Sequence, residues 1–158
     1  VRSIDSARRP LENARAMQSE QSTPVHGPDS WHRTLGIEYL TVTPERVIGR
    51  LMAGAQHHQP YGILHGGVYC SIVEDAASHG AGRLALARGL AGVVGVSNQT
   101  DFLRSHSEGE LRVEAAPLHS GRSQQLWEVR ITRASDGLLV CRGQVRFQNL
   151  DRLPEIRK

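Results

Sequence analysis

Residues 59–74 read QPYGILHGGVYCSIVE, and this stretch is the most informative part of the chain. Pro60 and Gly62 form a turn, after which His65 and two glycines lead into an apolar segment that holds one carboxylate, Glu74. Glycines before a helix let a ligand approach the backbone closely, and the first turn of a helix leaves N–H groups unpaired. A carboxylate among apolar residues can serve as a general base or a nucleophile. Amide donors and a carboxylate in one short segment therefore indicate chemistry on an acyl group.

Outward from this stretch, the chain alternates between one helical pattern and several strand patterns. Residues 66–88 are the only long helical candidate, and small and apolar side chains crowd most of its circumference, which indicates a buried helix. Alternating apolar and polar residues separated by short turns predict antiparallel hairpins with one solvated face. The predicted strands cover residues 35–42, 47–53, 93–105, 111–118, 127–132 and 139–148. The expected fold class is α+β, with a curved antiparallel sheet wrapped around one long central helix.

The chain of 158 residues is long enough for one domain with a substantial core. We expect a flexible arm over residues 1–30, which are polar and contain several prolines, a folded domain over residues 31–150, and a tail over residues 151–158. No apolar run reaches the roughly 18–20 residues of a membrane span, and the first residues lack the apolar core of a secretory signal. With only two cysteines and no disulfide pattern, we expect a cytoplasmic protein with no membrane partner.

The charge pattern favours a small anionic ligand over nucleic acid. Net charge is +3, and almost all basic residues are arginines, which bind phosphates through two parallel hydrogen bonds. The arginines are dispersed and only 4% of residues are aromatic, too few for base-stacking surfaces. The sequence also lacks the paired-cysteine spacing of a zinc site, and the adjacent His57 and His58 point apart. We therefore expect no nucleic acid partner, no metal and no cofactor.

The order of elements, together with QPYGILHGG and Glu74, resembles the hotdog-fold acyl-CoA thioesterases. The resemblance covers about residues 35–150 and is closest to the branch that hydrolyses 4-hydroxybenzoyl-CoA and 1,4-dihydroxy-2-naphthoyl-CoA. Its most specific part is Gln, Pro, Gly and His-Gly-Gly, followed by Glu nine residues after the His. Later segments that are also similar are Val93-Val94-Gly95, Arg104-Ser105, Pro117-Leu118-His119 and Gln125-Leu126-Trp127.

The resemblance implies a role for each matching residue. Glu74 matches the catalytic carboxylate, acting either as nucleophile on the thioester carbonyl or as general base toward water, and both roles stay open. The Gly66 N–H matches the donor that polarises the carbonyl, while His65 and Gln59 match residues that orient substrate and water. Ser78 matches a small hydroxyl residue one turn after the carboxylate.

The resemblance also implies a coenzyme A site and an open acyl preference. The matching positions are Arg104, Ser105, Ser120, Gly121, Arg122 and Ser123. One position departs from the pattern, because the dihydroxynaphthoyl branch carries a histidine where this chain has Phe102. The departure favours a less polar acyl group, and aryl and fatty acyl groups both stay open.

A distance argument predicts that the active site needs two chains. One helix rises about 1.5 Å per residue, so Gly66 and Glu74 lie about 12 Å apart along it, too far for one thioester carbonyl to contact both. Two helices packed antiparallel would bring Gly66 of one subunit beside Glu74 of the other. We therefore expect a homodimer, assembled further as a dimer of dimers (a homotetramer).

Other interpretations compete with these roles. Glu74 could instead pair with Arg83 or Arg88, and Asp75 and His79, at i and i+4, are expected to form an ordinary exposed pair. Cys70 is expected to be a buried structural thiol and not a nucleophile. Two whole-protein alternatives are a hotdog dehydratase or hydratase, which would need a histidine–acid pair not apparent here, and a non-catalytic acyl-CoA-binding module.

Overall fold

A computed structural model describes residues 31–153 of the chain. The arm expected over residues 1–30 lies outside the described residues, as does most of the expected tail. The described part begins with a short helix, α2 (Trp31–Leu35), and two strands, β1 (Ile37–Val42) and β2 (Val47–Ala53). A single-turn helix, η1 (Ala55–His57), precedes the long helix α3 (Gly66–Ala87). Four strands follow, namely β3 (Gly92–Phe102), β4 (Gly109–Ser120), β5 (Gln124–Arg133) and β6 (Leu139–Leu150).

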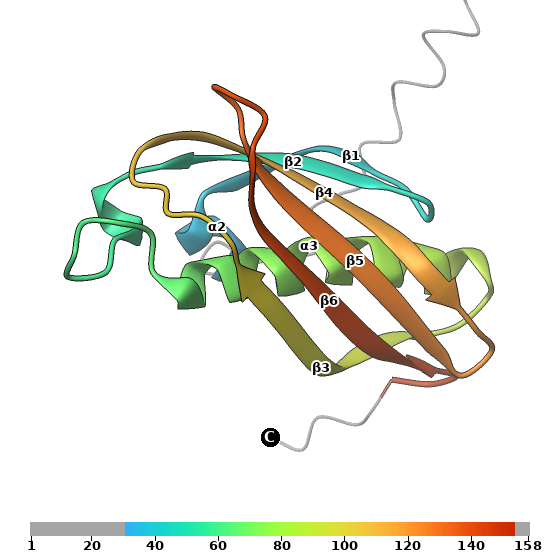
Figure 1. The fold of residues 1–158 in the computed structure, drawn as a ribbon. Helices are drawn as coiled ribbons and strands as arrows, with labels where there is room; N and C mark the ends of the chain where they lie inside the picture. Colours follow the sequence, from blue (N-terminus) through green and yellow to red (C-terminus); the bar gives the residue numbers. More distant parts are fainter. Residues whose placement is uncertain (1–30, 154–158) are drawn as a thin grey trace, which may run out of the picture. The chain divides into compact units, whose positions relative to one another are not determined.

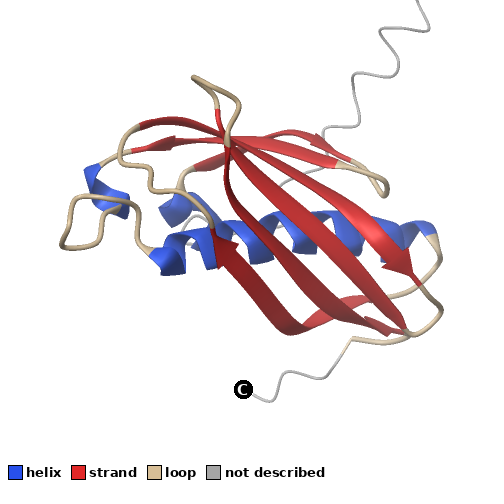
Figure 2. Ribbon diagram, viewed as in Figure 1, coloured by secondary structure: helices blue, strands red, loops and turns tan. Residues whose placement is uncertain are grey.

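The six strands form one antiparallel sheet that curves around α3 (Figures 1 and 2). Their order across the sheet is β1-β2-β4-β5-β6-β3, so β1 and β3 are the two edge strands. Strand β3 follows α3 in sequence but pairs only with β6, from Gly92 opposite Leu150 to Phe102 opposite Cys141. The predicted architecture of a curved antiparallel sheet around one long helix is confirmed.

Helix α3 is buried along most of its length because its inward side chains are small. Ile72, Val73, Ala76, Ala77 and Ala81 have no exposed surface and pack against the concave face of the sheet. Gly80 lies under the indole of Trp127, and a Cβ added at this position would overlap the ring. The small residues that the sequence analysis noted on this helix therefore let the sheet approach it closely.

Several strand boundaries differ from those predicted, and two of the differences change where particular residues lie. The strand expected from residue 35 begins only at Ile37, because Trp31–Leu35 form the helix α2, which no periodicity in so short a segment indicated. The strand expected to reach residue 105 ends at Phe102, so Arg104 and Ser105 lie in the loop that follows β3. The second strand has the predicted bounds of Val47–Ala53.

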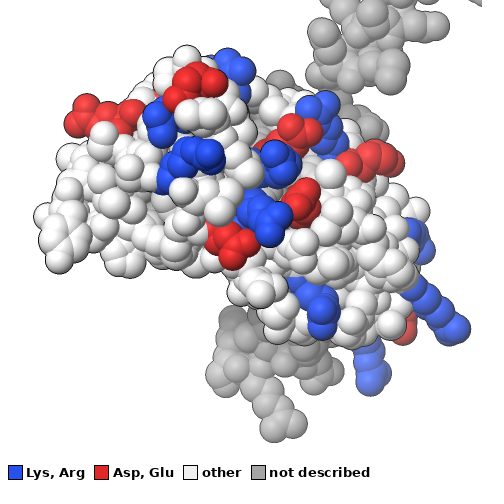
Figure 3. All heavy atoms as spheres, viewed as in Figure 1, with Lys and Arg blue, Asp and Glu red and all other residues white. Residues whose placement is uncertain are grey.

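The convex face of the sheet carries mixed charges. Basic and acidic side chains are interspersed on the face seen in Figure 3. Ion pairs join neighbouring segments, such as Arg142 on β6 with Asp101 on β3, and Arg46 in the turn before β2 with Glu114 on β4. This face has no continuous basic stripe of the kind that tracks a phosphate backbone. Within residues 31–153, no helix is both long and apolar enough to span a bilayer.

Candidate active site

A cavity of about 260 Å³ opens beside the first turn of α3 and brings four predicted site residues together. Gln59 and Gly66 border it from the segment before the helix and from the helix start, while Arg104 and Ser105 border it from the loop after β3. The remaining lining is mostly apolar and consists of Ile63, Leu64, Tyr69, Phe102, Leu103 and His106. The residues implied for carbonyl activation and for coenzyme A binding thus share one pocket, although they are about 40 residues apart in sequence.

The start of α3 is built so that the Gly66 N–H is free to bind a ligand. His65 is the N-cap residue, and its Nδ1 accepts a hydrogen bond from the N–H of Gly67 at 2.9 Å. Within residues 31–153, no backbone or side-chain acceptor binds the N–H of Gly66. A Cβ at Gly66 would lie 2.9 Å from the ring of Phe102, so only glycine fits here without displacing that ring. His65 therefore caps the helix start, while Gly66 borders the cavity and its N–H has no acceptor among residues 31–153.

Glu74 lies two turns further along α3 and does not border this cavity. Its Oε2 accepts a hydrogen bond from Nδ2 of Asn98 on β3 at 3.0 Å. Ser78, half-buried one turn later, follows Glu74 on the same side of the helix. In the part of the chain that the structure describes, no arginine forms an ion pair with Glu74, so the alternatives of Arg83 and Arg88 as partners are wrong.

The second group of predicted coenzyme A contacts lies at the other end of α3. The turn formed by Gly121, Arg122 and Ser123 joins β4 to β5, and Arg88, which caps the C-terminus of α3, donates hydrogen bonds to the carbonyl oxygens of Ser120 and Gly121. A helix of 22 residues is about 33 Å long, so within one chain this turn is remote from Arg104 and Ser105. The structure thus separates the predicted coenzyme A contacts into two groups.

Sequence analysis missed the groups on β3 that hold Glu74. Asn98 also donates to the carbonyl oxygen of Cys70, and Oγ1 of Thr100 donates to Oδ1 of Asn98 at 2.7 Å. Gly95 lets the carboxylate approach the strand, because a Cβ there would lie 2.5 Å from Oε1 of Glu74. The pairing of β3 with β6 shifts register between Gly95 and Ser97, an irregularity of the kind that often adjoins functional sites. Period-two alternation alone gave no sign of these contacts.

Other side chains that the sequence singled out have structural roles. His57 and His58 point to different partners, the carbonyl oxygens of Leu35 and Ser107. Cys70 and Cys141 are free thiols. Cys70 is only half-buried, while burial, followed by the nearby Cys70 and Asp101, raises the pKa of Cys141 to about 12, so Cys141 is not a thiolate nucleophile at neutral pH.

One expectation about polar side chains is wrong. The pair formed by Asp75 and His79 is not exposed, because their side chains are only 17% and 23% accessible and a third residue, His32, contacts the carboxylate. A residue from a segment distant in sequence thus helps to enclose this pair. His106, in the loop between β3 and β4, is buried and lines the cavity.

The curved sheet wrapped around one central helix defines the hotdog fold. The chain belongs to the Thioesterase superfamily, which it matches over residues 61–140, and it is a thioester hydrolase. It is 45% identical over 121 residues to a Mycobacterium tuberculosis protein named "Putative esterase Rv1847", covering 76% of this chain and 86% of that protein. It is 35% identical over 106 residues to the 1,4-dihydroxy-2-naphthoyl-CoA hydrolase of Listeria monocytogenes, covering 67% and 85%.

Solved structures agree with this assignment. The structure of the Mycobacterium tuberculosis esterase Rv1847/MT1895 superposes with a TM-score of 0.73 at 43% identity, covering 77% of this chain and 97% of that one. The Haemophilus influenzae thioesterase HI1161 superposes with a TM-score of 0.73 at 24% identity, covering 99% and 97%, a likeness that supports the fold. The predicted resemblance to hotdog thioesterases is therefore confirmed.

Proposed function

We propose that this chain hydrolyses an acyl-CoA thioester to a free acid and coenzyme A at a site shared by two subunits. Glu74 of one subunit acts on a carbonyl that is polarised by the Gly66 N–H of the other. The observation that carries the proposal is that the cavity at the start of α3 contains Gly66, Gln59, Arg104 and Ser105 but not Glu74. One chain thus holds the carboxylate outside the pocket that holds the amide donor.

The exposed edge strand supports a second copy as the source of the missing carboxylate. On the edge strand β3, Val94 and Val96 are 47% and 52% exposed. Exposed apolar side chains on an edge strand favour pairing with a strand of another chain. Glu74 faces this strand through Asn98. A two-fold axis that covers β3 and sets two α3 helices antiparallel would place Glu74 of one chain near the pocket of its partner.

The same symmetry would unite the two groups proposed to bind coenzyme A. In one chain, the turn formed by Ser120–Ser123 adjoins the C-terminus of α3, whereas Arg104 and Ser105 adjoin its N-terminus. Antiparallel helices would bring the turn of one subunit toward the loop of the other. Arg122 and Arg104 would then supply the positive charge for the nucleotide phosphates of a single ligand.

The pocket lining supports an apolar acyl group. Tyr69 and Phe102 lie with their ring centroids 5.9 Å apart at the side of the cavity, and Phe102 packs over Gly66. Among the described residues that line the cavity, Arg104 supplies the one guanidinium group and His106 adds an imidazole. An aryl or fatty acyl group would be bound through apolar contacts, while specificity for a hydroxylated ring would need polar partners at the position of Phe102.

The assembly as a dimer of dimers and the cytoplasmic location stay predictions.

The decisive experiment separates a shared site from a site within one chain. Chains carrying Glu74→Gln and chains carrying Gly66→Pro are each expected to be inactive in thiol release from a panel of aryl- and fatty acyl-CoA esters. Proline removes the N–H yet suits the first helical position, and His65, at φ −69° and ψ 137°, already has the conformation that precedes proline.

Co-expression of the two variants is expected to restore activity. Half of randomly assorted dimers are mixed, and each mixed dimer has one site with both Glu74 and the Gly66 N–H intact, so about a quarter of wild-type activity should return. An inactive mixture of folded, exchanging dimers would place both groups in one chain and end the proposal. Thioester binding without thiol release by the unaltered protein would favour the acyl-CoA-binding module instead.

A further inference from the structure

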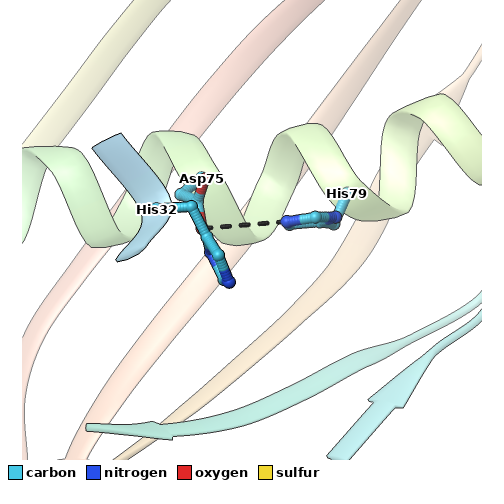
Figure 4. A group of neighbouring side chains, drawn as sticks. All are labelled: His32, Asp75 and His79. Carbon is cyan, nitrogen blue, oxygen red and sulfur yellow. Dashed lines mark hydrogen bonds and ion pairs between the residues drawn. The ribbon is translucent and has the colours of Figure 1, made fainter. Parts of the chain in front are cut away.

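A cluster of two imidazoles and one carboxylate lies on the side of α3 away from Glu74. Asp75 and His79 project from α3 one turn apart, and His32 reaches them from α2 (Figure 4). His32 Nδ1 lies 3.0 Å and His79 Nε2 lies 3.8 Å from Oδ2 of Asp75. One potential ligand atom from each residue falls within 4.8 Å of the other two. No spacing in the sequence pointed to this group, because His32 is 43 residues away from Asp75.

We propose that His32, Asp75 and His79 bind a divalent transition metal ion, with Zn²⁺ as the best-fitting occupant. Zinc bonds to imidazole nitrogens and carboxylate oxygens at about 2.0–2.2 Å, which sets neighbouring tetrahedral ligand atoms about 3.3–3.5 Å apart. The distances of 3.0 and 3.8 Å bracket this value, so the cluster would close on the ion through small side-chain rotations. Two imidazoles and one carboxylate suit Zn²⁺, Co²⁺ or Ni²⁺ and not Mg²⁺ or Ca²⁺, which prefer oxygen ligands.

The surroundings of the cluster support an ordered site. The hydroxyl of Tyr39 donates to Oδ2 of Asp75 at 2.7 Å, which fixes the carboxylate as outer-shell partners do in metal sites. Burial, and then the negative charge of Asp75, raises the pKa of Tyr39, so it stays a neutral donor. Aromatic contacts also restrain the imidazoles, because the Tyr39 ring stacks on His32 at 5.4 Å and meets His79 edge-on at 4.5 Å between centroids.

The cluster is half-buried. The side chains of His32, Asp75 and His79 are 21%, 17% and 23% exposed, whereas the Nε2 atom of His79 is itself buried, so an ion would enter as these side chains rotate. A bound ion would have at least these three protein ligands. It would tie α2 to the middle of α3, one residue beyond Glu74, and would be separate from the thioester pocket.

The test is metal binding by the full-length, tag-free and metal-stripped protein. Calorimetric titration with Zn²⁺ is expected to give one ion per chain, and Co²⁺ is expected to give the visible absorption of a four-coordinate complex. Zn²⁺ should raise the melting temperature whereas Mg²⁺ should not. Absence of stoichiometric Zn²⁺ binding would overturn the proposal, leaving the cluster as a hydrogen-bonded network.

Variants assign the binding to these residues. His79→Gln and His32→Gln are each expected to weaken Zn²⁺ binding by more than the ~10–100-fold that loss of an outer-shell partner costs, while Tyr39→Phe should fall within that range. His119→Gln removes an exposed imidazole on β4 and is the matched control, with Zn²⁺ affinity unchanged. Wild-type affinity in both ligand variants would overturn the proposal.

Crystals of the wild-type protein provide a measurement that needs no variant. An anomalous difference map at the zinc edge, from crystals soaked in Zn²⁺, should show its strongest peak between His32, Asp75 and His79. A map with its peaks only at other surface histidines would overturn the proposal even if the variants failed to fold.

Discussion

Glu74 and Asp75 are neighbours in sequence, yet they face two different sides of α3 with opposite character. Glu74 faces the edge strand β3, where its recorded partner among residues 31–153 is the amide of Asn98. Asp75 faces β1 and α2, where the hydroxyl of Tyr39 and the imidazole of His32 both contact its Oδ2. Successive helical residues point about 100° apart, so one step along the chain moves a carboxylate from an exposed edge to an enclosed cluster.

The different surroundings of Glu74 and Asp75 show how one helix can carry both a catalytic and a structural carboxylate. A carboxylate with few fixed donors keeps lone pairs for a substrate or a water molecule, which suits a base or a nucleophile. A carboxylate surrounded by an aromatic hydroxyl and imidazoles is committed to holding its neighbours in place. The β3 side of α3 is therefore expected to control turnover, and the β1 side to control stability.

The largest expected effect is that of Glu74→Gln on turnover. The amide can still accept the hydrogen bond from Asn98, so the fold should be kept, but it can act neither as a base nor as a nucleophile. Loss of a general base costs about 10²–10⁴-fold in rate. Thiol release should fall by this amount, with a melting temperature near that of the wild type. Glu45→Gln, the same change at an exposed turn between β1 and β2, should leave the rate unchanged.

If Asp75→Asn lowered turnover as much as Glu74→Gln, the two sides of α3 would not differ in function. We expect the asparagine to act mainly through stability, because it weakens the hydrogen bonds of Tyr39 and His32 to a charged acceptor. A fully active Glu74→Gln enzyme would contradict the assignment of chemistry to the β3 side.

Gly66→Pro is expected to have the second largest effect, again on turnover. One oxyanion donor is worth about 10²–10³-fold in turnover, and proline removes that donor while keeping a backbone suited to the helix start. Gly66→Ala is the matched control, because it adds the same Cβ against the ring of Phe102 but retains the N–H. Steady-state kinetics should show a much larger loss of kcat for proline than for alanine. Equal losses would mean that crowding of Phe102, not the missing donor, accounts for the effect.

Much of the β3 side could be anticipated from sequence because its determinants are local. The spacing of Gln59, His65, Gly66 and Glu74 falls within 16 consecutive residues, and turn and helix-start chemistry places them without knowledge of the sheet. The strand patterns are likewise local, and they correctly indicated six strands and one long helix. Local signals thus sufficed for the architecture, whereas the roles of these residues, and their grouping with Arg104 and Ser105, came from the resemblance to a known family.

The rest depends on contacts that only the tertiary structure creates. Asn98 reaches Glu74 across 24 residues, and His32 reaches Asp75 across 43, so neither contact leaves a periodic signature. The five-residue helix α2 is too short to show a helical period, and it is α2 that covers Asp75 and makes the expected exposed pair half-buried. Long-range burial and not local propensity therefore decides the character of the β1 side.

Gly95→Ala is expected to have a moderate effect on turnover, and it tests whether the position of Glu74 against β3 matters for catalysis. The new Cβ would lie 2.5 Å from Oε1 of Glu74, so the carboxylate must move away from the position that Asn98 holds. Misplacing a catalytic group by about 1 Å can cost up to about 10²-fold, so we expect a loss of kcat of about tenfold with a smaller change in KM. Gly92→Ala in the same strand, where the nearest atom is a flexible Leu153 methyl group at 3.3 Å, is the control and should remain active. Unchanged kcat in Gly95→Ala would show that the position of Glu74 is not critical.

Tyr39→Phe is expected to have the smallest effect on turnover of these changes, and to act on stability. It removes a 2.7 Å hydrogen bond to a carboxylate, and bonds to charged groups contribute about 1.5–3 kcal/mol. The effect should also depend on pH, because burial and Asp75 raise the pKa of Tyr39 above its ordinary value of 10. In the unfolded chain the phenol ionises near pH 10, whereas in the folded protein it stays neutral, so its contribution is complete below pH 10 and declines above it. Denaturant unfolding from pH 7 to pH 11 should show a constant gap between wild type and variant up to about pH 9, which then narrows.

Tyr69→Phe separates the hydrogen bond of Tyr39 from its titration. Burial, and then Cys141, raises the pKa of Tyr69 to about 12, yet its hydroxyl has no hydrogen-bond partner within residues 31–153. At pH 7, Tyr69→Phe should therefore cost little stability or none, while above pH 10 it too should remove part of the alkaline destabilisation. If both variants lost the same stability at pH 7, the bond from Tyr39 to Asp75 would contribute nothing specific. The two sides of α3 would then differ in shape but not in the stability that their hydrogen bonds contribute.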